Sequence, residues 1–438
     1  MMALDLLTRL DPFRPIRCPF CFERFAALAM HLRCNAPNCK SDFARMVDDP
    51  ILSRALNGPR RTVVANLRSP WWVDPRRDPR RGLRRHFDWF VLPASVDCGV
   101  CGTPTDYRLC PCCHAHLPDA VVTADAGHIA VFGPQSVGKT TFVTVLLHEL
   151  DHRIGPDRGF ILDPLTDEIR ERYERDYHEL TYGGGRFGIG EEVAGEADRR
   201  SHSPTPGIEI DRGTLRPLVY RLTRRDGRSR GSSTLLSFFD TAGEDWEMNI
   251  EGLRDEARYF GQAKGLLFLI DPLRIRGVAR DPRLRLTEKE GRVPAADYLS
   301  DARKLATFFP RLPSRTPLAI CLNKLDRWGG LMEPGSTLHD LARSIAADPP
   351  DRGLDDQIHA EVITALRDWG AGGFLDHIAV NFPVYRFFAC SALGDAAQDR
   401  DDALQPLPTP LLVDRPALWL LERQGIVRGE GREQKAKR

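Results

Sequence analysis

The stretch Gly133-Pro-Gln-Ser-Val-Gly-Lys-Thr-Thr141 decides how the rest of this chain is interpreted. It lies between the apolar runs 129–132 and 142–147, which predicts a strand, a glycine-rich turn and a helix. In that context glycines allow successive backbone N–H groups to face a phosphate chain, and the helix adds the positive end of its dipole. The stretch is therefore a candidate phosphate-binding loop of the pattern Gly-x4-Gly-Lys-Thr.

The residues of this loop have separate expected roles. Lys139 is expected to reach the β- and γ-phosphates, and the hydroxyl of Thr140 to bind Mg²⁺. The other residues expected to contact the phosphates are Gly133, Gln135, Ser136, Val137, Gly138 and Thr141. The alternative is a glycine turn without a ligand, and the motifs further along the chain argue against it.

Composition places the chain among globular proteins. It has 438 residues, of which 42% are hydrophobic and 28% charged, enough for two or three domains. The net charge of +1 favours neither nucleic acid nor an acidic membrane as a partner. The N-terminus does not read as a signal peptide, and no stretch approaches the ~20 apolar residues of a membrane helix. We therefore expect a cytoplasmic protein without an integral membrane segment.

Nine of the 11 cysteines lie before residue 114, and in a cytoplasmic protein such crowding predicts metal binding rather than disulfides. A two-residue spacing lets two thiolates point at one ion, and two such turns make a closed tetrahedral site. Two structural zinc sites are expected, one formed by Cys18, Cys21, Cys34 and Cys39 and the other by Cys98, Cys101, Cys110 and Cys113. A crossed arrangement, in which the early pair shares an ion with the late pair, stays open, as does a ligand from Cys112, His114 or His116.

The segment 60–90 between the two clusters combines nine arginines with Trp71, Trp72 and Trp89. Basic residues interleaved with aromatic ones can hold single-stranded nucleic acid. We favour instead a connector whose tryptophans dock on the neighbouring domain, because arginine supplies most of the chain's 62 basic residues.

A candidate switch segment follows a helical pattern at 165–182. That pattern stops at Gly183-Gly-Gly185, and the next thirty or so residues are rich in Gly, Pro, Ser and Glu, which predicts a long mobile loop. A threonine in such a loop can reach Mg²⁺ and the γ-phosphate in the triphosphate state only. Thr205 is the candidate, and Thr181 and Thr214 are the alternatives.

Apolar runs at 217–223 and 235–239 predict two more strands, the second of which ends in Asp240-Thr-Ala-Gly243. An acidic residue at the carboxyl end of a buried strand can hold Mg²⁺ through water, and the N–H of Gly243 can meet the γ-phosphate. The expected magnesium ligands are thus Thr140, Thr205 and Asp240. The candidate catalytic residues are Lys139, Thr205, Gly243 and Glu244.

Recognition of a base is expected at two further strand ends. The strand predicted at 317–322 leads into Asn323-Lys-Leu-Asp326, and an aspartate there can accept hydrogen bonds from N1 and N2 of guanine but not from adenine. The strand predicted at 385–390 leads into Ser391-Ala-Leu393, where the N–H of Ala392 can meet guanine O6. The base-binding candidates are Asn323, Lys324, Asp326, Ser391, Ala392 and Leu393. A strand at 265–271 and helices at 295–309, 337–347, 354–369 and 416–424 complete the pattern.

These four motifs, in this order and each at the carboxyl end of a predicted strand, resemble the P-loop GTPases of the TRAFAC class, to which translation factors and Ras-like proteins belong. The resemblance covers residues 127–424. It implies an α/β fold with a Ras-like, doubly wound, mostly parallel six-stranded sheet and helical insertions, whose antiparallel edge strand begins at Pro217. It also implies GTP or GDP as ligand, Mg²⁺ as cofactor and GTP hydrolysis as activity. More narrowly, a zinc-ribbon N-terminus before such a domain resembles bacterial GTPases of conflict and defence gene systems, of the double-GTPase type.

Two positions depart from the family pattern. Glu244 stands where Ras-like enzymes carry the glutamine that positions the attacking water, and its charge would be repelled by the γ-phosphate. Slow hydrolysis, or hydrolysis that depends on a partner, is therefore expected. Ser136 stands where potassium-activated relatives carry asparagine, so dependence on potassium is not expected.

The sequence thus predicts three parts: a zinc-binding module at 1–120, a Ras-like GTPase domain at 127–424 and a charged C-terminal tail at 425–438. The leading hypothesis is a Mg²⁺-dependent GTPase that acts as a nucleotide switch for a protein effector or activating partner. One alternative is a guanine-nucleotide-binding scaffold without hydrolysis, which Glu244 keeps open. The other is a zinc-ribbon nucleic-acid binder regulated by GTP.

Overall fold

The computed structural model describes residues 15–32, 46–48, 61–63, 95–97, 101–134, 136–182, 217–224, 233–240, 263–284, 286, 295–308, 315–343, 353–394 and 407–427. The chain divides into two compact units, one of residues 1–126 with 209–235 and the other of residues 127–208 with 236–438. Within the described ranges, no helix has the length and apolar character needed to cross a membrane.

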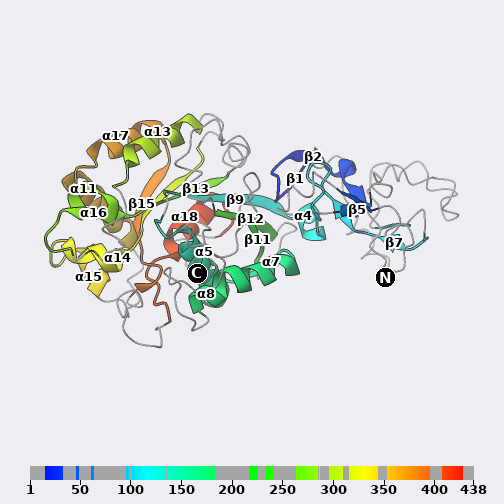
Figure 1. Ribbon diagram of the computed structural model, residues 1–438, viewed down its shortest axis with the longest axis horizontal. Helices are drawn as coiled ribbons and strands as arrows, with labels where there is room; N and C mark the ends of the chain where they lie inside the picture. The colour runs from blue at the N-terminus through cyan, green and yellow to red at the C-terminus, as the bar shows by residue number, and fades with distance from the viewer. Residues whose placement is uncertain are drawn as a thin grey trace, which may run out of the picture. The chain divides into compact units, whose positions relative to one another are not determined.

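The central feature is a seven-stranded sheet with the strand order β10-β11-β12-β9-β13-β14-β15 (Figure 1). Along the chain its strands are β9 (Asp125–Phe132), β10 (Phe160–Pro164), β11 (Leu218–Arg224), β12 (Ser233–Asp240), β13 (Gly265–Ile270), β14 (Leu318–Leu322) and β15 (Tyr385–Ala389).

Four neighbouring strands of this sheet run parallel. β13 pairs with β9 and with β14, and β14 pairs with β15, with Leu266 opposite both Ala130 and Leu318. Every residue of β13 and β14 is buried, which explains why both read as continuous apolar runs instead of alternating ones. Because parallel strands end at the same edge of a sheet, the segments that follow β9, β13, β14 and β15 meet there.

The expectation of six strands with an edge strand from Pro217 is wrong. β10 is a seventh strand and forms the edge of the sheet, whereas β11 lies between β10 and β12. β10 is only five residues long and follows the left-handed Gly159, and its Ile161 is 43% exposed. So short and partly exposed a run has little apolar signal of its own, and its pairing with β11 makes it a strand.

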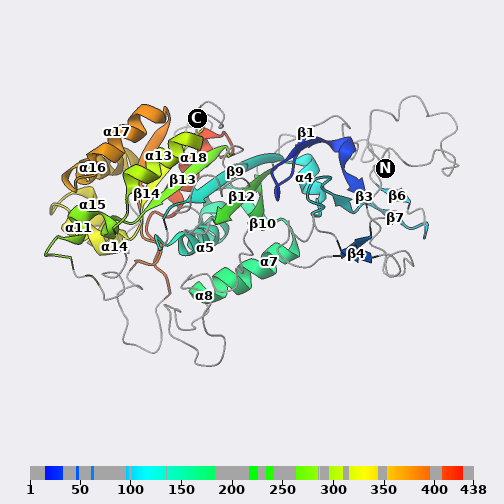
Figure 2. The same cartoon turned by 45° about the horizontal axis from the view of Figure 1, so that its top comes forward.

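Two helical segments come between β9 and β11. The first comprises α5 (Lys139–Glu149), the π-helical turn η5 (Leu150–Ile154) and α6 (Gly155–Arg158). The second comprises α7 (Asp167–Tyr173), the π-helical turn η6 (Glu174–His178) and α8 (Glu179–Tyr182), which form one continuous rod in Figure 2. Its start is capped by Thr166, whose hydroxyl accepts a hydrogen bond from the N–H of Ile169. η6 and α8 pack against α5.

The remaining helices lie in the second half of the chain. They are η7 (Pro272–Arg274), α11 (Arg276–Ala279), α13 (Tyr298–Phe308), α14 (Leu325–Trp328), η9 (Gly329–Leu331), α15 (Thr337–Arg343), α16 (Leu354–Asp368), α17 (Gly372–Asn381) and α18 (Asp414–Arg423). α16 packs on β15, α18 on β13 and β14, and α13 on α17. In the core, the rings of Phe132 and Phe268 stack with centroids 4.9 Å apart.

The described part of the N-terminal unit consists of short elements. Antiparallel pairs are formed by β1 (Pro15–Arg17) with β2 (Arg24–Ala26), β3 (His31–Leu32) with β8 (Arg108–Leu109), β4 (Met46–Asp48) with β5 (Arg61–Val63), and β6 (Val96–Asp97) with β7 (Pro104–Thr105). Two single turns of helix, η1 (Ala27–Ala29) and α4 (Asp119–Thr123), complete it. Strands this short are marginal by themselves, so the unit needs further support.

Gly329 provides a test of the packing of η9 against α15. A β-carbon at this position would overlap the β-carbon of Ala342, whereas one at the neighbouring Gly330 would meet nothing within 4 Å. We expect Gly329→Ala to lower the free energy of unfolding by about 1–3 kcal/mol, the usual cost of overpacking. Gly330→Ala is the matched control and is expected to be neutral or slightly stabilising in the same urea titration. Equal stability of the two variants would contradict this packing.

Candidate functional site

The segment between β9 and α5 has a tight and partly left-handed backbone. Ser136 and Gly138 have φ angles of 63° and 85°, a region that favours glycine. A β-carbon at Gly133 would lie 2.5 Å from the carbonyl oxygen of Leu269 in β13, and one at Gly138 would lie 3.0 Å from Nδ2 of Asn323. Glycine is needed at Gly133 because the carbonyl oxygen leaves no room for a β-carbon, and it is favoured at Gly138 because the backbone there is left-handed.

Lys139 is the first residue of α5 and is only 6% exposed. Its Nζ donates hydrogen bonds to the carbonyl oxygens of Gly133 and Pro134, at 2.9 and 3.0 Å. Both acceptors belong to the preceding loop, so the ammonium group lies inside the curve of the backbone. Hydrogen bonds from a cation to an anion are stronger than those to a neutral carbonyl, so a phosphate oxygen would compete well for this ammonium group.

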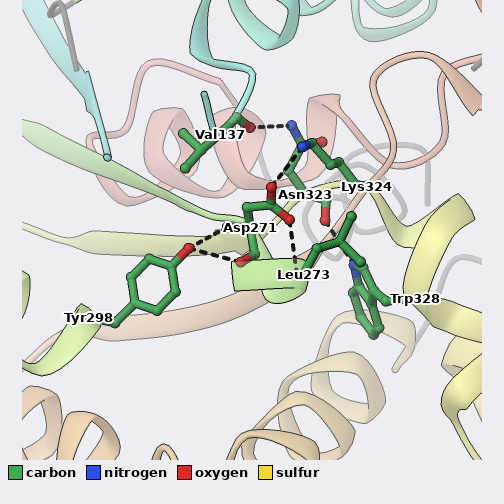
Figure 3. A network of polar contacts seen from close by, with 7 residues as sticks. All are labelled: Val137, Asp271, Leu273, Tyr298, Asn323, Lys324 and Trp328. Atoms are coloured by element: carbon green, nitrogen blue, oxygen red, sulfur yellow. Dashed lines mark hydrogen bonds and ion pairs between the residues drawn. The ribbon is translucent and has the colours of Figure 1, made fainter. Parts of the chain in front are cut away.

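Asn323 joins this loop to the end of β14. Its side-chain Nδ2 donates to the carbonyl oxygen of Val137 at 3.0 Å, and its backbone carbonyl oxygen accepts a hydrogen bond from Nε1 of Trp328 at 2.8 Å (Figure 3). Its backbone N–H donates to the carbonyl oxygen of Ile270 in β13. Asn323 is 3% exposed and thereby connects the segments that follow three neighbouring strands.

The next residue, Lys324, is paired with an acidic residue that the sequence analysis did not assign to the site. Nζ of Lys324 lies 2.7 Å from Oδ2 of Asp271, which directly follows β13 and is 3% exposed (Figure 3). Oδ1 of Asp271 accepts a hydrogen bond from the N–H of Leu273, and its backbone N–H and carbonyl both bond to the hydroxyl of Tyr298 at 2.9 Å. The available signal was the position of Asp271 after a buried apolar run, as for Asp240.

Asp326 and Ser391 form the opposite side of this region. The hydroxyl of Ser391 donates to Oδ1 of Asp326 and accepts a hydrogen bond from the N–H of Gly394 at 2.9 Å. Oδ2 of Asp326 is buried and has no hydrogen-bond partner among the described residues. Burial raises the pKa of the Asp326 carboxyl. A buried acceptor without a partner costs about 1–3 kcal/mol, so this oxygen is suited to receive a donor from a ligand.

The other candidates of the sequence analysis are distributed as follows. Thr140 and Thr141 lie half-buried in the first turn of α5, and Ala392 and Leu393 follow Ser391. Thr181, an alternative switch threonine, is buried in α8 and donates its hydroxyl proton to the carbonyl oxygen of Tyr177. Asp240 is the last residue of β12, but its side chain lies outside the described part of the structure, as do Gln135, Thr205, Thr214, Gly243 and Glu244.

A separate candidate metal centre lies in the N-terminal unit. It consists of Cys18, Cys21, Cys110 and Cys113, whose Sγ atoms all lie within 4.8 Å of one another. The Cys18–Cys113 and Cys21–Cys110 Sγ pairs are each 3.7 Å apart. Four thiolates bound to zinc at ~2.3 Å in a tetrahedron would be about 3.8 Å apart, so the cluster fits this ion.

The two Cys-x-x-Cys turns have the same backbone pattern, 92 residues apart. Cys18 donates its N–H to the carbonyl of Glu23 and accepts at its own carbonyl from Phe22, and Cys110 does the same with Ala115 and His114. Phe22 and His114 are both left-handed, with φ angles of 61° and 59°. The Sγ atoms of Cys18 and Cys110 accept hydrogen bonds from the N–H two residues later, at 3.4 and 3.3 Å. Such bonds stabilise thiolates around a cation.

The ligand sets expected from the sequence are therefore corrected. The structure unites the early pair with the late pair, which is the crossed arrangement that the spacing left open. Cys101 is exposed and is not part of the cluster, and Cys112 is exposed beside it. Cys34, Cys39 and Cys98 lie outside the described residues, so a second zinc site stays a prediction. Spacing alone could not choose, because each of the four cysteine pairs can share an ion with any of the three others.

No family model matches the sequence. The chain is 27% identical over 307 residues to a Mycolicibacterium smegmatis protein described as "Putative ESX-1 scaffolding and assembly protein SaeC", and the match covers 66% of this chain and 72% of that protein. A solved signal recognition particle receptor SRb-GTP/SRX complex from Chaetomium thermophilum matches 61% of this chain and 92% of its own at 12% identity. Its TM-score of 0.26 is too low to carry an argument.

Variants of the cysteine cluster test its composition. We expect Cys21→Ser to bind one zinc ion fewer than the unmodified chain, because three thiolates do not close the site. Cys112→Ser is the matched control and should retain the zinc, since the Cys112 thiol is not one of the four that gather within 4.8 Å of one another. The double variant Cys18→Ser/Cys113→Ser is expected to lose one ion by native mass spectrometry. Loss of two ions would support the two separate sets instead.

Proposed function

We propose that this chain binds GTP or GDP with Mg²⁺ at the carboxyl ends of β9, β14 and β15, and that it acts as a nucleotide switch. The observation that carries the proposal is the buried Oδ2 of Asp326, which has no hydrogen-bond partner among the described residues. Asp326 lies three residues after Asn323, whose side chain bonds to the loop that precedes Lys139. A base acceptor and a phosphate-binding ammonium group are thus fixed relative to each other. This combination suits a nucleotide whose base donates two hydrogen bonds.

The phosphates would lie over the loop that precedes α5. Backbone N–H groups at the start of that helix favour negative charge, and Lys139 would transfer its hydrogen bonds from the carbonyls of Gly133 and Pro134 to phosphate oxygens. The hydroxyl of Thr140 would bind Mg²⁺, with Thr205 and Asp240 as the proposed further ligands. Gln135, Ser136, Val137, Gly138 and Thr141 would line the phosphate chain.

The base would lie between Lys324 and the Ser391–Leu393 segment. Guanine N1 and N2 would donate to Asp326, and the N–H of Ala392 would donate to O6. The pair of Lys324 with Asp271 fixes the lysine stem, which presents apolar surface beside the base. Ser391 orients the Asp326 carboxylate by donating to its other oxygen.

Replacement of Asp326 tests the identity of the base. In Asp326→Asn an amide donor can face guanine N1–H, so we expect GTP affinity to fall by about 100-fold or more and affinity for xanthosine triphosphate to rise. Binding of fluorescent nucleotides measured by competition would report both changes. Asp376→Asn, an exposed aspartate on α17, is the matched control and should bind GTP normally. ATP binding as tight as GTP binding in the unmodified chain would refute guanine recognition.

We further propose that the chain hydrolyses GTP slowly, or with an activating partner, and signals its nucleotide state to a protein through the cysteine-rich unit. Glu244 can orient water as a hydrogen-bond acceptor, but its charge opposes the γ-phosphate. Lys139 would stabilise the charge that develops on the transferred phosphoryl group. Gly243 and Thr205 would contact the γ-phosphate in the triphosphate state.

Single-turnover hydrolysis at saturating Mg²⁺ tests the role of Glu244. If it orients water, Glu244→Gln should keep or raise the rate and Glu244→Ala should lower it. Lys139→Ala should lose nucleotide binding or hydrolysis and serves as the negative control. Rates within about twofold for both Glu244 variants would mean that another group positions the water.

A scaffold that binds guanine nucleotide without hydrolysis is the second candidate function. The description of the M. smegmatis relative as a putative scaffolding and assembly protein favours it. The same hydrolysis assay, run for hours with and without cell extract, separates the two functions. Release of phosphate in either condition supports the GTPase, and its absence in both leaves the scaffold.

A further inference from the structure

The turn 391–394, which follows β15, is held by a second segment of the chain, residues 409–412, which we call the strap. Ser391 and Leu411 exchange both of their backbone hydrogen bonds, at 3.0 and 2.8 Å, and form an antiparallel bridge. Both residues are buried, so water does not compete for these bonds. The strap thus fixes the start of the turn to which the proposed base contact belongs.

Prolines determine which backbone groups of the strap can donate. Pro408 and Pro410 have no N–H, and each restricts the residue before it to extended backbone. The N–H groups that remain between 408 and 411 are those of Thr409 and Leu411. Thr409 donates to the carbonyl oxygen of Leu393 at 3.1 Å, and Leu411 donates to the turn as well. Every N–H of this stiff stretch therefore holds the turn.

Two left-handed residues fit the strap against the turn. Gly394 has a φ angle of 59°, and a β-carbon there would lie 2.1 Å from the carbonyl oxygen of Thr409. Leu412 has a φ angle of 56°, which is unfavourable for a residue with a large side chain. It is buried at the end of the strap, two residues before α18 begins. Backbone strain of this kind persists only where the surroundings impose it, and it is frequent at ligand sites.

The N–H of Ala392 is left available inside this clamp. The N–H of Ser391 is taken by Leu411, and that of Gly394 by the hydroxyl of Ser391. Ala392 is buried, and its N–H makes no hydrogen bond to another residue that the structure describes. A buried donor without an acceptor destabilises the protein, so this group suits an acceptor on a ligand.

We propose that the strap sets the recognition of the 6-oxo group of the base, because it holds the N–H of Ala392 opposite that oxygen. This inference rests on the proposed binding of guanine nucleotide. Asp326, in the segment after β14, would contact N1 and N2, so separate elements would recognise the two edges of the base. A fixed donor disfavours a base with a weaker acceptor at that position, because the N–H then stays unsatisfied. Gly394 and Thr409 are positioning residues that act through Ala392.

Paired measurements of nucleotide affinity test the strap. GTP is compared with 6-thioguanosine triphosphate, which keeps N1–H and the 2-amino group but carries sulfur, a weaker acceptor, in place of the 6-oxo oxygen. We expect the unmodified chain to bind GTP about 3- to 10-fold more tightly, the usual effect of one hydrogen bond. In Gly394→Ala the added β-carbon displaces Thr409 from the turn, so GTP affinity should fall and this ratio should approach one.

A second variant and two controls accompany this measurement. Pro410→Gly loosens the strap without removing a hydrogen-bonding group, should lower the same ratio, and carries the test if Gly394→Ala does not fold. Inosine triphosphate lacks the 2-amino group and reports the contact with Asp326, so the ratio of GTP to inosine triphosphate affinity should change by less than about twofold in both variants. Gly425→Ala is the matched control, because Gly425 has a φ angle of 71° but a β-carbon there meets nothing within 4 Å. It should keep both ratios.

An unchanged ratio of GTP to thio-analogue affinity in the folded variants would overturn the role of the strap. An equal fall in the ratio of GTP to inosine triphosphate affinity would also overturn it, because the whole base site would then have been disturbed. So would a ratio near one in the unmodified chain, since the 6-oxo group would then have no fixed donor. Absence of GTP binding in the unmodified chain is a distinct result, which would refute the proposed function and the strap's role with it.

Discussion

The hydrogen bond from Nδ2 of Asn323 to the carbonyl oxygen of Val137 is the interaction on which the arrangement of the site depends. It joins the loop after β9 to the segment after β14, two strands that are separated in the sheet by β13. Because Asn323 is buried and its backbone also bonds to Ile270 and Trp328, neither partner can shift alone. A buried network with its partners in place specifies one geometry, which preorganisation of a ligand site requires.

The two acidic side chains near Asn323 differ in whether their oxygens have hydrogen-bond partners. Asp271, which pairs with Lys324, is held in place by the hydroxyl of Tyr298 through its backbone N–H and carbonyl, so the pair contributes rigidity. Asp326, two residues after Lys324, keeps one buried oxygen without a partner in the described structure. A buried acceptor without a partner destabilises the protein, and a ligand that donates a hydrogen bond to it can remove this cost. This contrast separates a supporting charge pair from a recognition group, although both involve an aspartate near the end of a strand.

The cysteine cluster of Cys18, Cys21, Cys110 and Cys113 bears on the stability of the N-terminal region. The strands described within residues 15–109 are two or three residues long, and strands this short are marginal by themselves. Cys18 and Cys113 are 95 residues apart, so an ion bound by both would close a long loop and remove much of the entropy of the unfolded chain. Each of the two Cys-x-x-Cys turns, which share one hydrogen-bond pattern, would then supply a preformed pair of thiolates.

The sequence by itself determined the residues that meet at the carboxyl ends of β9, β14 and β15, because glycine spacing and buried apolar runs are local signals. It also predicted metal-binding turns among the early cysteines, and Cys18, Cys21, Cys110 and Cys113 form a cluster that could hold an ion. Only the tertiary structure decided which pairs of cysteines come together, that β10 completes the sheet, and that Asp271 pairs with Lys324. The reason is that three-dimensional packing decides which distant segments come into contact, and neither the periodicity nor the spacing of residues in the sequence contains that information.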